Sequence, residues 1–283
     1  MPSTIDIRRR IRSVKNTQQI TKAMKMVSAA KLRRAQERIF AARPYAAAMR
    51  QVLSSVSTRV DVNAHPLLQE REEKKVLFLV VTSDKGLAGA FNANAIKATQ
   101  NAIRDTNAEV ELLPIGRKAN DFFRRRAIPI RRQAAHVFQA LSLATAKEIA
   151  DALIADFLSG EIDAVYVIYN EFRSVMSQIV RTEKLLPLAR AWDEPQNAID
   201  YLYEPSPEAI LNDILPKHIE FQLYRVLLES AAAEQGARMT AMESATKNAS
   251  EMISHLTLTY NRIRQAAITK EIIEIVSGAA AAQ

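Results

Sequence analysis

Residue types that could do chemistry gather in the stretch TSDKGLAGAFN. Ser83 and Asp84 are adjacent, but neither a nearby histidine nor a nucleophile-elbow sequence accompanies them. Gly86 and Gly89 follow, with Lys85 beside them, at the kind of strand-to-helix turn that binds phosphates in many α/β proteins. Their spacing matches neither GxGxxG nor the P-loop pattern. A tight, closely packed turn is therefore the favoured interpretation, and a phosphate site stays open as the alternative.

Other candidate groups are scattered. The four histidines (His65, His136, His218 and His255) include no pair with the spacing of a metal site within one element. Glu271 and Glu274 are close together, but on one helix surface a solvated pair is the simpler explanation. The sequence thus predicts no catalytic residue, no cofactor site and no metal site.

Length and composition set the class of protein. The chain has 283 residues, of which 48% are hydrophobic and 25% charged, enough for one sizeable core plus an extended element. No run of 18 apolar residues is present, so we expect no membrane-spanning helix. The absence of cysteine excludes disulfides, thiol catalysis and cysteine-metal sites, and it fits a reducing compartment.

The positive charge is concentrated at the N-terminus. Residues 1–59 contain fourteen Lys or Arg against Asp6 and Glu37, whereas the whole chain has a net charge of only +8. Such a segment can be a transit peptide, a nucleic-acid arm or a surface that docks on an acidic protein. The helical pattern continues past Ala42 without a cleavage site, which argues against a transit peptide. The first 39 residues lack an aromatic side chain to stack on bases. A solvated basic face and a docking face for an acidic protein remain the two main alternatives.

The middle of the chain alternates short apolar runs with helical patterns. The expected strands are 76–81, 109–115 and 164–169, with an edge strand at 178–186; the expected helices are 92–104, 118–126 and 142–158. This alternation predicts a Rossmann-like, mostly parallel sheet covered on both faces. A linker, 59–75, should precede this central domain of residues 76–207, and a proline-containing loop, 192–207, should follow it.

Two long helices flank the central domain. From Lys217 to Gln283 the chain lacks proline, and apolar or small residues step by three and four at Met242, Ala245, Ala249, Met252, Leu256, Thr259, Ile263 and Ala266. A matching seam runs through Ile7, Ile11, Val14, Gln18, Thr21, Met24, Ser28, Leu32, Ala35, Ile39 and Ala42. Because the chain leaves the first helix and later returns through the second, residues 1–58 and 208–283 should pair as a long antiparallel coiled coil. Pro44 predicts a kink in the first helix.

The second helix is longer than the first by about a dozen residues. Its tip should project about 15 to 20 Å beyond the N-terminal helix. That tip contains Ile272, Ile273, Ile275 and Val276, apolar side chains that a lone helix cannot bury. Three outcomes are open: a sleeve provided by another protein, a frayed tail, or a tip folded back on its own domain.

Three stretches resemble the gamma subunit of the rotary F-type ATP synthase: NTQQITKAMKMVSAAKLRRAQ (16–36), TSDKGLAGAFN (82–92) and ITKEIIEIVSGA (268–279). YNRIRQAA (260–267) and YLYEP (201–205) are also similar to that family. Ala88 and Ala90 stand where the family often has Cys and Gly, and no cysteine pair like that of the redox-regulated chloroplast form is present.

The resemblance implies a non-catalytic central-stalk rotor that couples proton flow to ATP synthesis or hydrolysis. Its partners would be three alpha and three beta subunits, the epsilon subunit and the membrane c-ring, with no nucleic acid and no direct membrane insertion. By motif, Met24, Lys25, Arg264 and Gln265 would contact beta subunits; Ile272, Ile273, Ile275 and Val276 would sit in an apolar bearing; and Tyr201, Leu202, Tyr203 and Glu204 would meet the c-ring and epsilon. The family motif begins near residue 1 without a leader, which indicates a bacterial chain or a trimmed organellar one; the expected location is the cytoplasmic face of a bacterial inner membrane.

Overall fold

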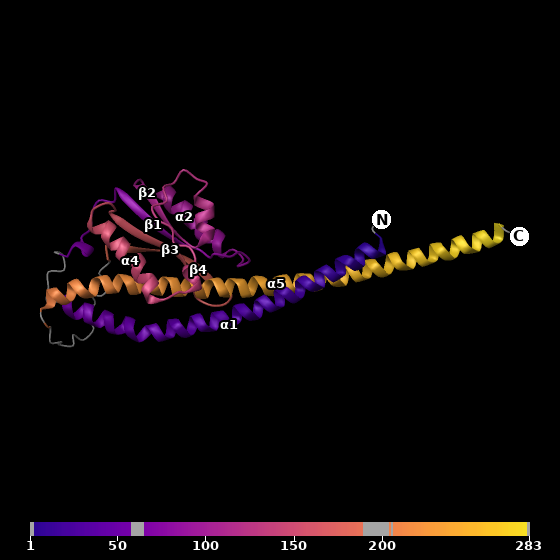
Figure 1. Cartoon of the computed structure of the whole chain (residues 1–283), viewed down its shortest axis with the longest axis horizontal. Helices are drawn as coiled ribbons and strands as arrows, with labels where there is room; N and C mark the ends of the chain where they lie inside the picture. Colours follow the sequence, from indigo (N-terminus) through magenta and orange to yellow (C-terminus); the bar gives the residue numbers. More distant parts are fainter. Residues whose placement is uncertain (1–2, 58–64, 189–203, 205, 282–283) are drawn as a thin grey trace. The chain divides into compact units, whose positions relative to one another are not determined.

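A computed structural model describes residues 3–57, 65–188, 204 and 206–281 (Figure 1). They belong to two compact units: Met1–Ser28 with Met239–Gln283, and Ala29–Arg238. Helices α1 (Thr4–Ser57) and α5 (Pro207–Ala281) contribute to both units.

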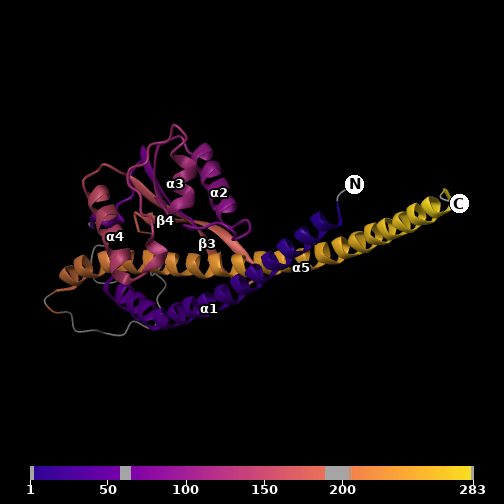
Figure 2. The ribbon, with the colours of Figure 1, turned by 45° about the vertical axis from the view of Figure 1, so that its right-hand side comes forward.

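The larger unit contains a four-stranded sheet in the order β2-β1-β3-β4. The strands are β1 (Lys75–Val81), β2 (Glu109–Ile115), β3 (Ala164–Phe172) and β4 (Gln178–Leu186). Both neighbours of β1 are parallel to it, and β4 pairs antiparallel with β3 at the edge. The helices α2 (Phe91–Asp105), α3 (Arg117–Phe123) and α4 (Leu143–Leu158) connect the strands (Figure 2). The mostly parallel α/β domain predicted from the sequence is confirmed, although α3 ends three residues earlier than expected.

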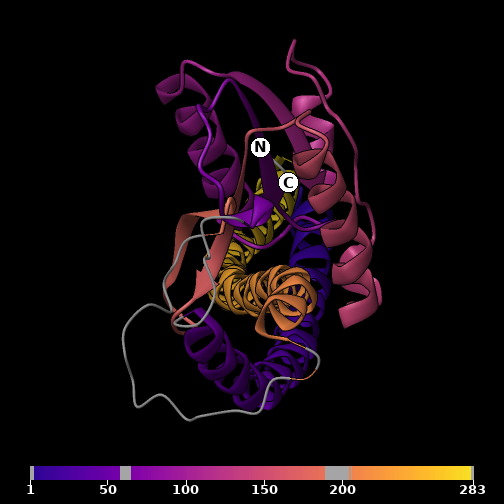
Figure 3. The same ribbon diagram turned by 90° about the vertical axis from the view of Figure 1, so that its left-hand side faces the viewer.

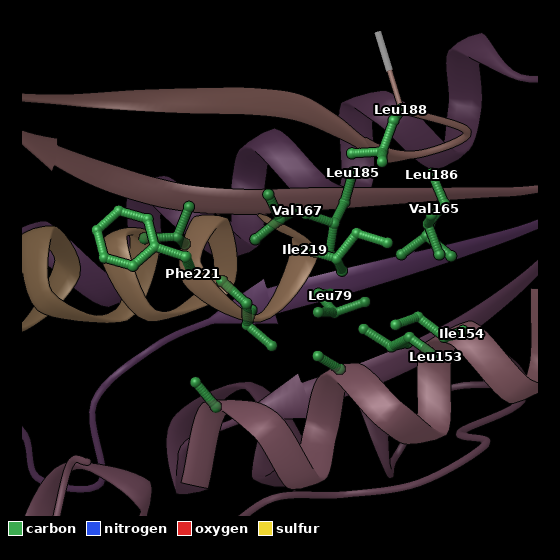
Figure 4. Close-up of a cluster of buried hydrophobic side chains, with 14 of the residues drawn as sticks. Leu79, Leu153, Ile154, Val165, Val167, Leu185, Leu186, Leu188, Ile219 and Phe221 are labelled. Carbon is green, nitrogen blue, oxygen red and sulfur yellow. The ribbon is translucent and has the colours of Figure 1, made fainter. Parts of the chain in front are cut away.

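Alternate residues of the central strands face two separate cores. Val76, Phe78 and Val80 pack with α2 and α3 on one face. Leu77, Leu79 and neighbouring strand residues pack on the other face with α4 and with the long helices (Figure 4). Burial on both faces explains why these strands read as continuous apolar runs rather than as alternating ones.

The start of α5 and the end of α1 complete the second core. Leu211, Leu215 and Ile219 recur every four residues along α5 and are fully or almost fully buried. Tyr45 of α1 and Phe221 of α5 bring their ring centroids to 5.0 Å, and Figure 3 shows the orange start of α5 next to α1. These two helix segments therefore form part of the domain core.

Helix α5 begins at Pro207, one residue before the predicted helical segment 208–283 and ten residues before the proline-free run from Lys217, so Pro216 lies inside it. Proline has no N–H, so the carbonyl of Asn212 loses its usual helical donor. The buried leucines on both sides of Pro216 explain why the helix nevertheless continues. Helix α1 likewise continues through Pro44.

The predicted linker is partly structured. Residues 58–64 lie outside the described part, but Pro66–Leu68 forms a short 3-10 helix, in which Leu67 and Leu68 are buried in the core. The backbone N–H of Leu67 donates to Nδ1 of His65 at 3.2 Å. This short helix therefore packs its two leucines into the same core as α4.

In the smaller unit the two long helices run antiparallel. Four side-chain contacts join them: Arg8 to Tyr260, Gln18 to Ser250, Thr21 to Thr246, and Lys25 to Glu243. The two residue numbers in each contact add to 267 or 268, so the pairing keeps one register throughout. Antiparallel pairing of the N- and C-terminal helices is thus confirmed for this unit.

The predicted seam is correct along this part of α1 and needs two corrections in α5. Ile7, Thr21 and Ser28 are buried as expected. In α5, however, Met252 is 53% exposed while the neighbouring Ile253 is half-buried, and Ala266 is exposed. The prediction of Met252 as a seam residue is wrong because two heptad patterns fit this sequence. The contacts of Thr246 and Tyr260 with α1 show that the seam follows the pattern that contains Ile253. Ala266 is exposed because it lies beyond the last residue that α1 can face.

Candidate functional site: an unpartnered helix tip and the surfaces near it

Among the residues that the structure describes, no helix pairs with the end of α5. In the observed register, Thr4, the first residue of α1, lies opposite position 264, whereas α5 continues to Ala281. About seventeen residues, or about 25 Å of helix, therefore extend past α1, somewhat more than predicted. Figure 1 shows this yellow segment of α5 continuing beyond the N-terminus.

The extension exposes a continuous apolar surface. Every residue from Arg264 to Gly278 is exposed, and the exposed fractions of Ile272, Ile273, Ile275 and Val276 are 56%, 59%, 71% and 61%. The described tip does not fold back to bury these side chains. Exposed apolar side chains that are contiguous, rather than scattered, mark an interaction surface.

Arg264 and Gln265 lie where helix pairing ends. Both side chains are exposed. Their guanidinium and amide groups are available to an external acceptor, a kind of hydrogen bond that is strong when one partner is charged. Their position separates the paired shaft from the apolar tip.

Met24 and Lys25 lie in the paired region instead. Met24 is half-buried in the seam, and Nζ of Lys25 is 2.7 Å from Oε1 of Glu243. The two charged side chains are 37% and 61% exposed. A solvent-exposed pair of this kind contributes at most about 1 kcal/mol to stability. The four residues predicted to contact beta subunits thus lie in two places. Arg264 and Gln265 are at the start of the free tip, and Met24 and Lys25 are in the paired region.

A second apolar surface was missed by the sequence reasoning. Ile20, Met26 and Val27 on α1 are between 56% and 61% exposed, and Leu258 on α5 is 70% exposed. The sequence could have indicated this surface, because these apolar residues fall outside the seam positions of their helices. Lys22 is exposed on the same helix, so this part of the shaft presents apolar and basic groups together.

The TSDKGLAGAFN stretch forms a tight turn. The backbone N–H and the hydroxyl of Ser83 lie 2.9 and 3.0 Å from Oδ1 of Asn92. Oδ1 of Asp84 accepts backbone N–H bonds from Arg117 and His136. Both candidate polar groups are thus used to fix loops, and the ring of His136 lies beside Asp84, with Nδ1 4.0 Å from Oδ2.

The same turn packs closely against α5. Ala88 and Phe91 are buried against Ala233 and Ala237. Leu87 and Gly89 have φ of 63° and 55°, so the chain is held in a left-handed conformation at this point. These observations favour the tight-turn interpretation of the glycine pair.

An ionic network connects the sheet edge to α5. Nη2 of Arg225 lies 2.6 Å from Glu183 on β4, and Nη1 lies 3.1 Å from Glu229. The hydroxyl of Tyr169 donates to Glu183 at 2.6 Å, and burial raises the pKa of Tyr169. Burial also raises the pKa of Glu229, although the guanidinium of Arg225 opposes this rise. These contacts fasten the central domain to the helix that carries the free tip.

The residues predicted to meet the c-ring and epsilon lie mostly outside the described part of the chain. This applies to Tyr201, Leu202 and Tyr203, whereas Glu204 is described and exposed. Glu204 borders a groove of about 550 Å³ between the end of α1 and the start of α5, which also includes Tyr45. None of the described helices combines the length and apolarity that crossing a bilayer requires.

Comparisons with known proteins agree over nearly the full length. The sequence model of the "ATP synthase" family matches residues 3–282. The chain is 52% identical over 287 residues to the ATP synthase gamma chain of Chlorobaculum parvum, covering 99% of this chain and 98% of the relative. It is 51% identical over 282 residues to the ATP synthase gamma chain of a Geobacter species, covering 98% of each.

Solved structures give the same fold. A chain in the central stalk and c-ring of the Tetrahymena thermophila mitochondrial ATP synthase matches with a TM-score of 0.62 and 27% identity, over 80% of this chain and 99% of that one. A chain in the Euglena gracilis mitochondrial ATP synthase matches with a TM-score of 0.70 and 21% identity, over 98% of this chain and 94% of that one. The family model and the relatives at 51% and 52% identity show that the chain belongs to the ATP synthase gamma chain family, and its antiparallel helices and four-stranded domain agree with that assignment.

Proposed function

We propose that this chain is the central-stalk rotor of an F-type ATP synthase. It transmits torque between a membrane c-ring and a catalytic hexamer of alpha and beta subunits, and thereby couples proton flow to ATP synthesis or hydrolysis. The observation that carries this proposal is the unpartnered apolar end of α5, because such a surface requires a surrounding protein. The chain itself makes and breaks no bond; the chemistry belongs to the assembled complex.

The apolar tip occupies a bearing at the closed end of the hexamer. Ile272, Ile273, Ile275 and Val276 spread over roughly 160° of the helix surface, so they form one broad apolar face of the shaft. An apolar contact has no directional bonds, so it tolerates rotation at little cost. This accounts for the choice of aliphatic rather than charged side chains there.

Lys25 and Met24 contact beta subunits lower on the shaft. The weak ion pair between Lys25 and Glu243 can be exchanged for a pair with a beta-subunit carboxylate because little stability is lost when it opens. Arg264 and Gln265 meet beta-subunit loops at the start of the free tip.

Coupling requires that the shaft differ from one side to another. An orientation of the rotor shifts a catalytic site only by its difference in interaction with the open and closed states of that site. Exposed apolar groups such as Ile20 and Val27 lie on one face of α1, and basic groups such as Lys22 lie on others. Each beta subunit therefore meets a different surface of the shaft at any moment.

The opposite end of the chain rests on the c-ring and binds epsilon. Tyr201, Leu202, Tyr203 and Glu204 make these contacts, and Glu204 borders the groove at the ends of the long helices. We assign residues 1–58 and 208–283 to the shaft, 59–75 to the linker and 76–207 to the foot domain. The complex lies on the cytoplasmic face of a bacterial inner membrane.

The assembly itself provides the first test. ATPase activity is measured for this chain alone, for alpha plus beta subunits, and for all three together. We expect the chain alone to be inert and to change the turnover of the other two, with a weaker effect after truncation at Ile268. Hydrolysis by the isolated chain, or failure to join the hexamer, would contradict the proposal.

A double substitution tests the proposed beta contacts. Arg264→Ala with Gln265→Ala should weaken ATP hydrolysis or its coupling to proton pumping, because charge-assisted bonds worth about 1.5 to 3 kcal/mol are lost. Unfolding of the isolated chain should not change, because both side chains are exposed. Unaltered hydrolysis and pumping in the double variant would show that these residues do not contact the catalytic subunits.

A further inference from the structure

A basic cleft lies within the larger unit, apart from the helix tip, and the 82–92 turn contributes Asp84 and Lys85 to it. It has a volume of about 580 Å³ and is bordered by α1, by the turn before α2, by residues 138–141 and by α5. Five cationic side chains line it: Lys31, Arg34, Arg38, Lys85 and Arg238. Lys31, Arg34 and Arg38 are spaced three and four residues apart and so share one face of α1.

Two carboxylates in the cleft are already satisfied. Oε1 of Glu234 lies 2.7 Å from Nη2 of Arg238, and both side chains are about nine-tenths buried. Asp84 accepts the two backbone N–H bonds of the turn. With five cations and two carboxylates, the cleft has a net charge of +3.

Within the described part of the chain the remaining cations form no direct ion pair, although Lys31 is near enough to Glu234 to interact with it electrostatically. Lys31, Arg34 and Lys85 form no ion pair with any residue among those the structure describes, and Arg38 donates only to the carbonyl of Leu141, at 3.3 Å. Like charges held around one concave space repel one another and favour an anion between them. Lys31, Arg34, Arg38 and Lys85 are exposed and border the same cleft, so they are accessible to an anion bound there.

The dimensions and chemistry of the cleft fit one class of ligand. Its volume lies within the range of small-molecule sites. Arg guanidinium groups bind phosphate oxygens through paired hydrogen bonds, and Lys supplies a compact charge. Phe138 adds a partly apolar wall beside these groups. We infer that this cleft binds a chain of phosphates, either in a nucleoside triphosphate or in inorganic polyphosphate, and so clamps α1, the 82–92 turn and α5 together.

Binding to the full-length chain tests this inference directly. Isothermal titration calorimetry at low ionic strength compares tripolyphosphate, ATP and adenosine. We expect tripolyphosphate and ATP to bind, with affinity that falls as salt rises, and adenosine not to bind. Tighter binding of ATP than of tripolyphosphate would identify a nucleotide as the ligand, and equal binding would identify the phosphate chain alone.

Matched variants separate a site from general charge attraction. Lys31→Gln, Arg34→Gln and Lys85→Gln together should weaken tripolyphosphate binding at least tenfold. The control variant, Arg12→Gln, Lys15→Gln and Lys22→Gln, removes the same charge from exposed positions elsewhere on α1 and should change the affinity less than twofold. If the triple cleft variant does not fold by circular dichroism, Lys85→Gln alone should still weaken binding about threefold.

Two results would overturn the inference. One is the absence of binding by the unaltered chain to either phosphate compound at low salt. The other is an equal loss of affinity in the cleft and control variants, which would indicate attraction to the overall positive charge. Neither result depends on assembly with other subunits, so the rotor proposal is judged separately.

Discussion

The apolar tip of α5 allows a prediction that separates internal stability from assembly. Replacing Ile272, Ile273, Ile275 and Val276 together by Ala removes aliphatic surface while keeping the best helix-forming residue. Because these side chains are between 56% and 71% exposed, the isolated subunit should unfold at an unchanged urea concentration. A loss of binding free energy should appear only when a partner protein covers the tip.

The magnitude follows from the carbons that the substitutions remove. Each Ile loses three carbons and Val loses two, at about 0.8 kcal/mol for each carbon fully withdrawn from water. Because somewhat more than half of each side chain is exposed, a sleeve that covers the tip can gain about 5 kcal/mol from these groups. Association recovers only part of such a gain. We therefore expect a loss of at least about 1.4 kcal/mol in binding to the hexamer, which is tenfold in affinity.

The assay measures binding of the purified subunit to the alpha and beta subunits by surface plasmon resonance or by dilution of the assembled complex. The control replaces Leu143, Leu158 and Met176, exposed apolar residues of the central domain, by Ala. Unchanged affinity of the tip variant would refute an apolar bearing. A marked loss of stability in the isolated tip variant would show instead that the tip packs against its own chain.

Three further predictions concern stability within the chain. Burial lowers the pKa of His218 to about 4, so the unfolded state binds more protons between pH 4 and 6.5, and stability falls as the pH drops through that range. Between pH 7.5 and 5 urea unfolding should show a loss about 2 kcal/mol larger for the unaltered chain than for His218→Gln, and equal losses would contradict the buried neutral histidine. Gly116 has φ of 88° and an added Cβ would lie 2.0 Å from a backbone carbonyl oxygen, whereas Gly160 has open space at φ of 77°. Gly116→Ala should therefore lower the free energy of unfolding by about 3 kcal/mol or more and Gly160→Ala by about 1 kcal/mol, a ranking that equal effects would overturn. Thr21→Val with Thr246→Val removes both partners of the 2.8 Å contact between the helices, so the double variant should be close to neutral in thermal unfolding while either single variant is destabilised by about 1 to 2 kcal/mol; a double variant as unstable as the sum of the two singles would show that the hydroxyls do not act as a pair.

Much of the architecture could be predicted because it rests on local periodicity. The strand runs, the alternation with helices and the seam of α1 all follow from residue spacing, and the structure confirms them. The motifs of 16–36, 82–92 and 268–279 were specific enough to indicate the family that the comparisons then showed. The length difference between the two helices likewise followed from counting residues, which is why a free tip could be expected.

Other features depended on which distant residues meet. Two seam patterns were compatible with the α5 sequence, and only the observed register chose Ile253 over Met252. Residue spacing could not show that α5 continues through Pro216, because the core that compensates for the proline is built by β1, α4 and α1. The gathering of positive charges in the cleft could not be predicted from the sequence either, because Lys31, Lys85 and Arg238 lie far apart in it. Short-range periodicity is set by backbone geometry and can be read from one segment, whereas register, burial and charge pairing are set by long-range contacts, whose free energies exist only once the chain has folded.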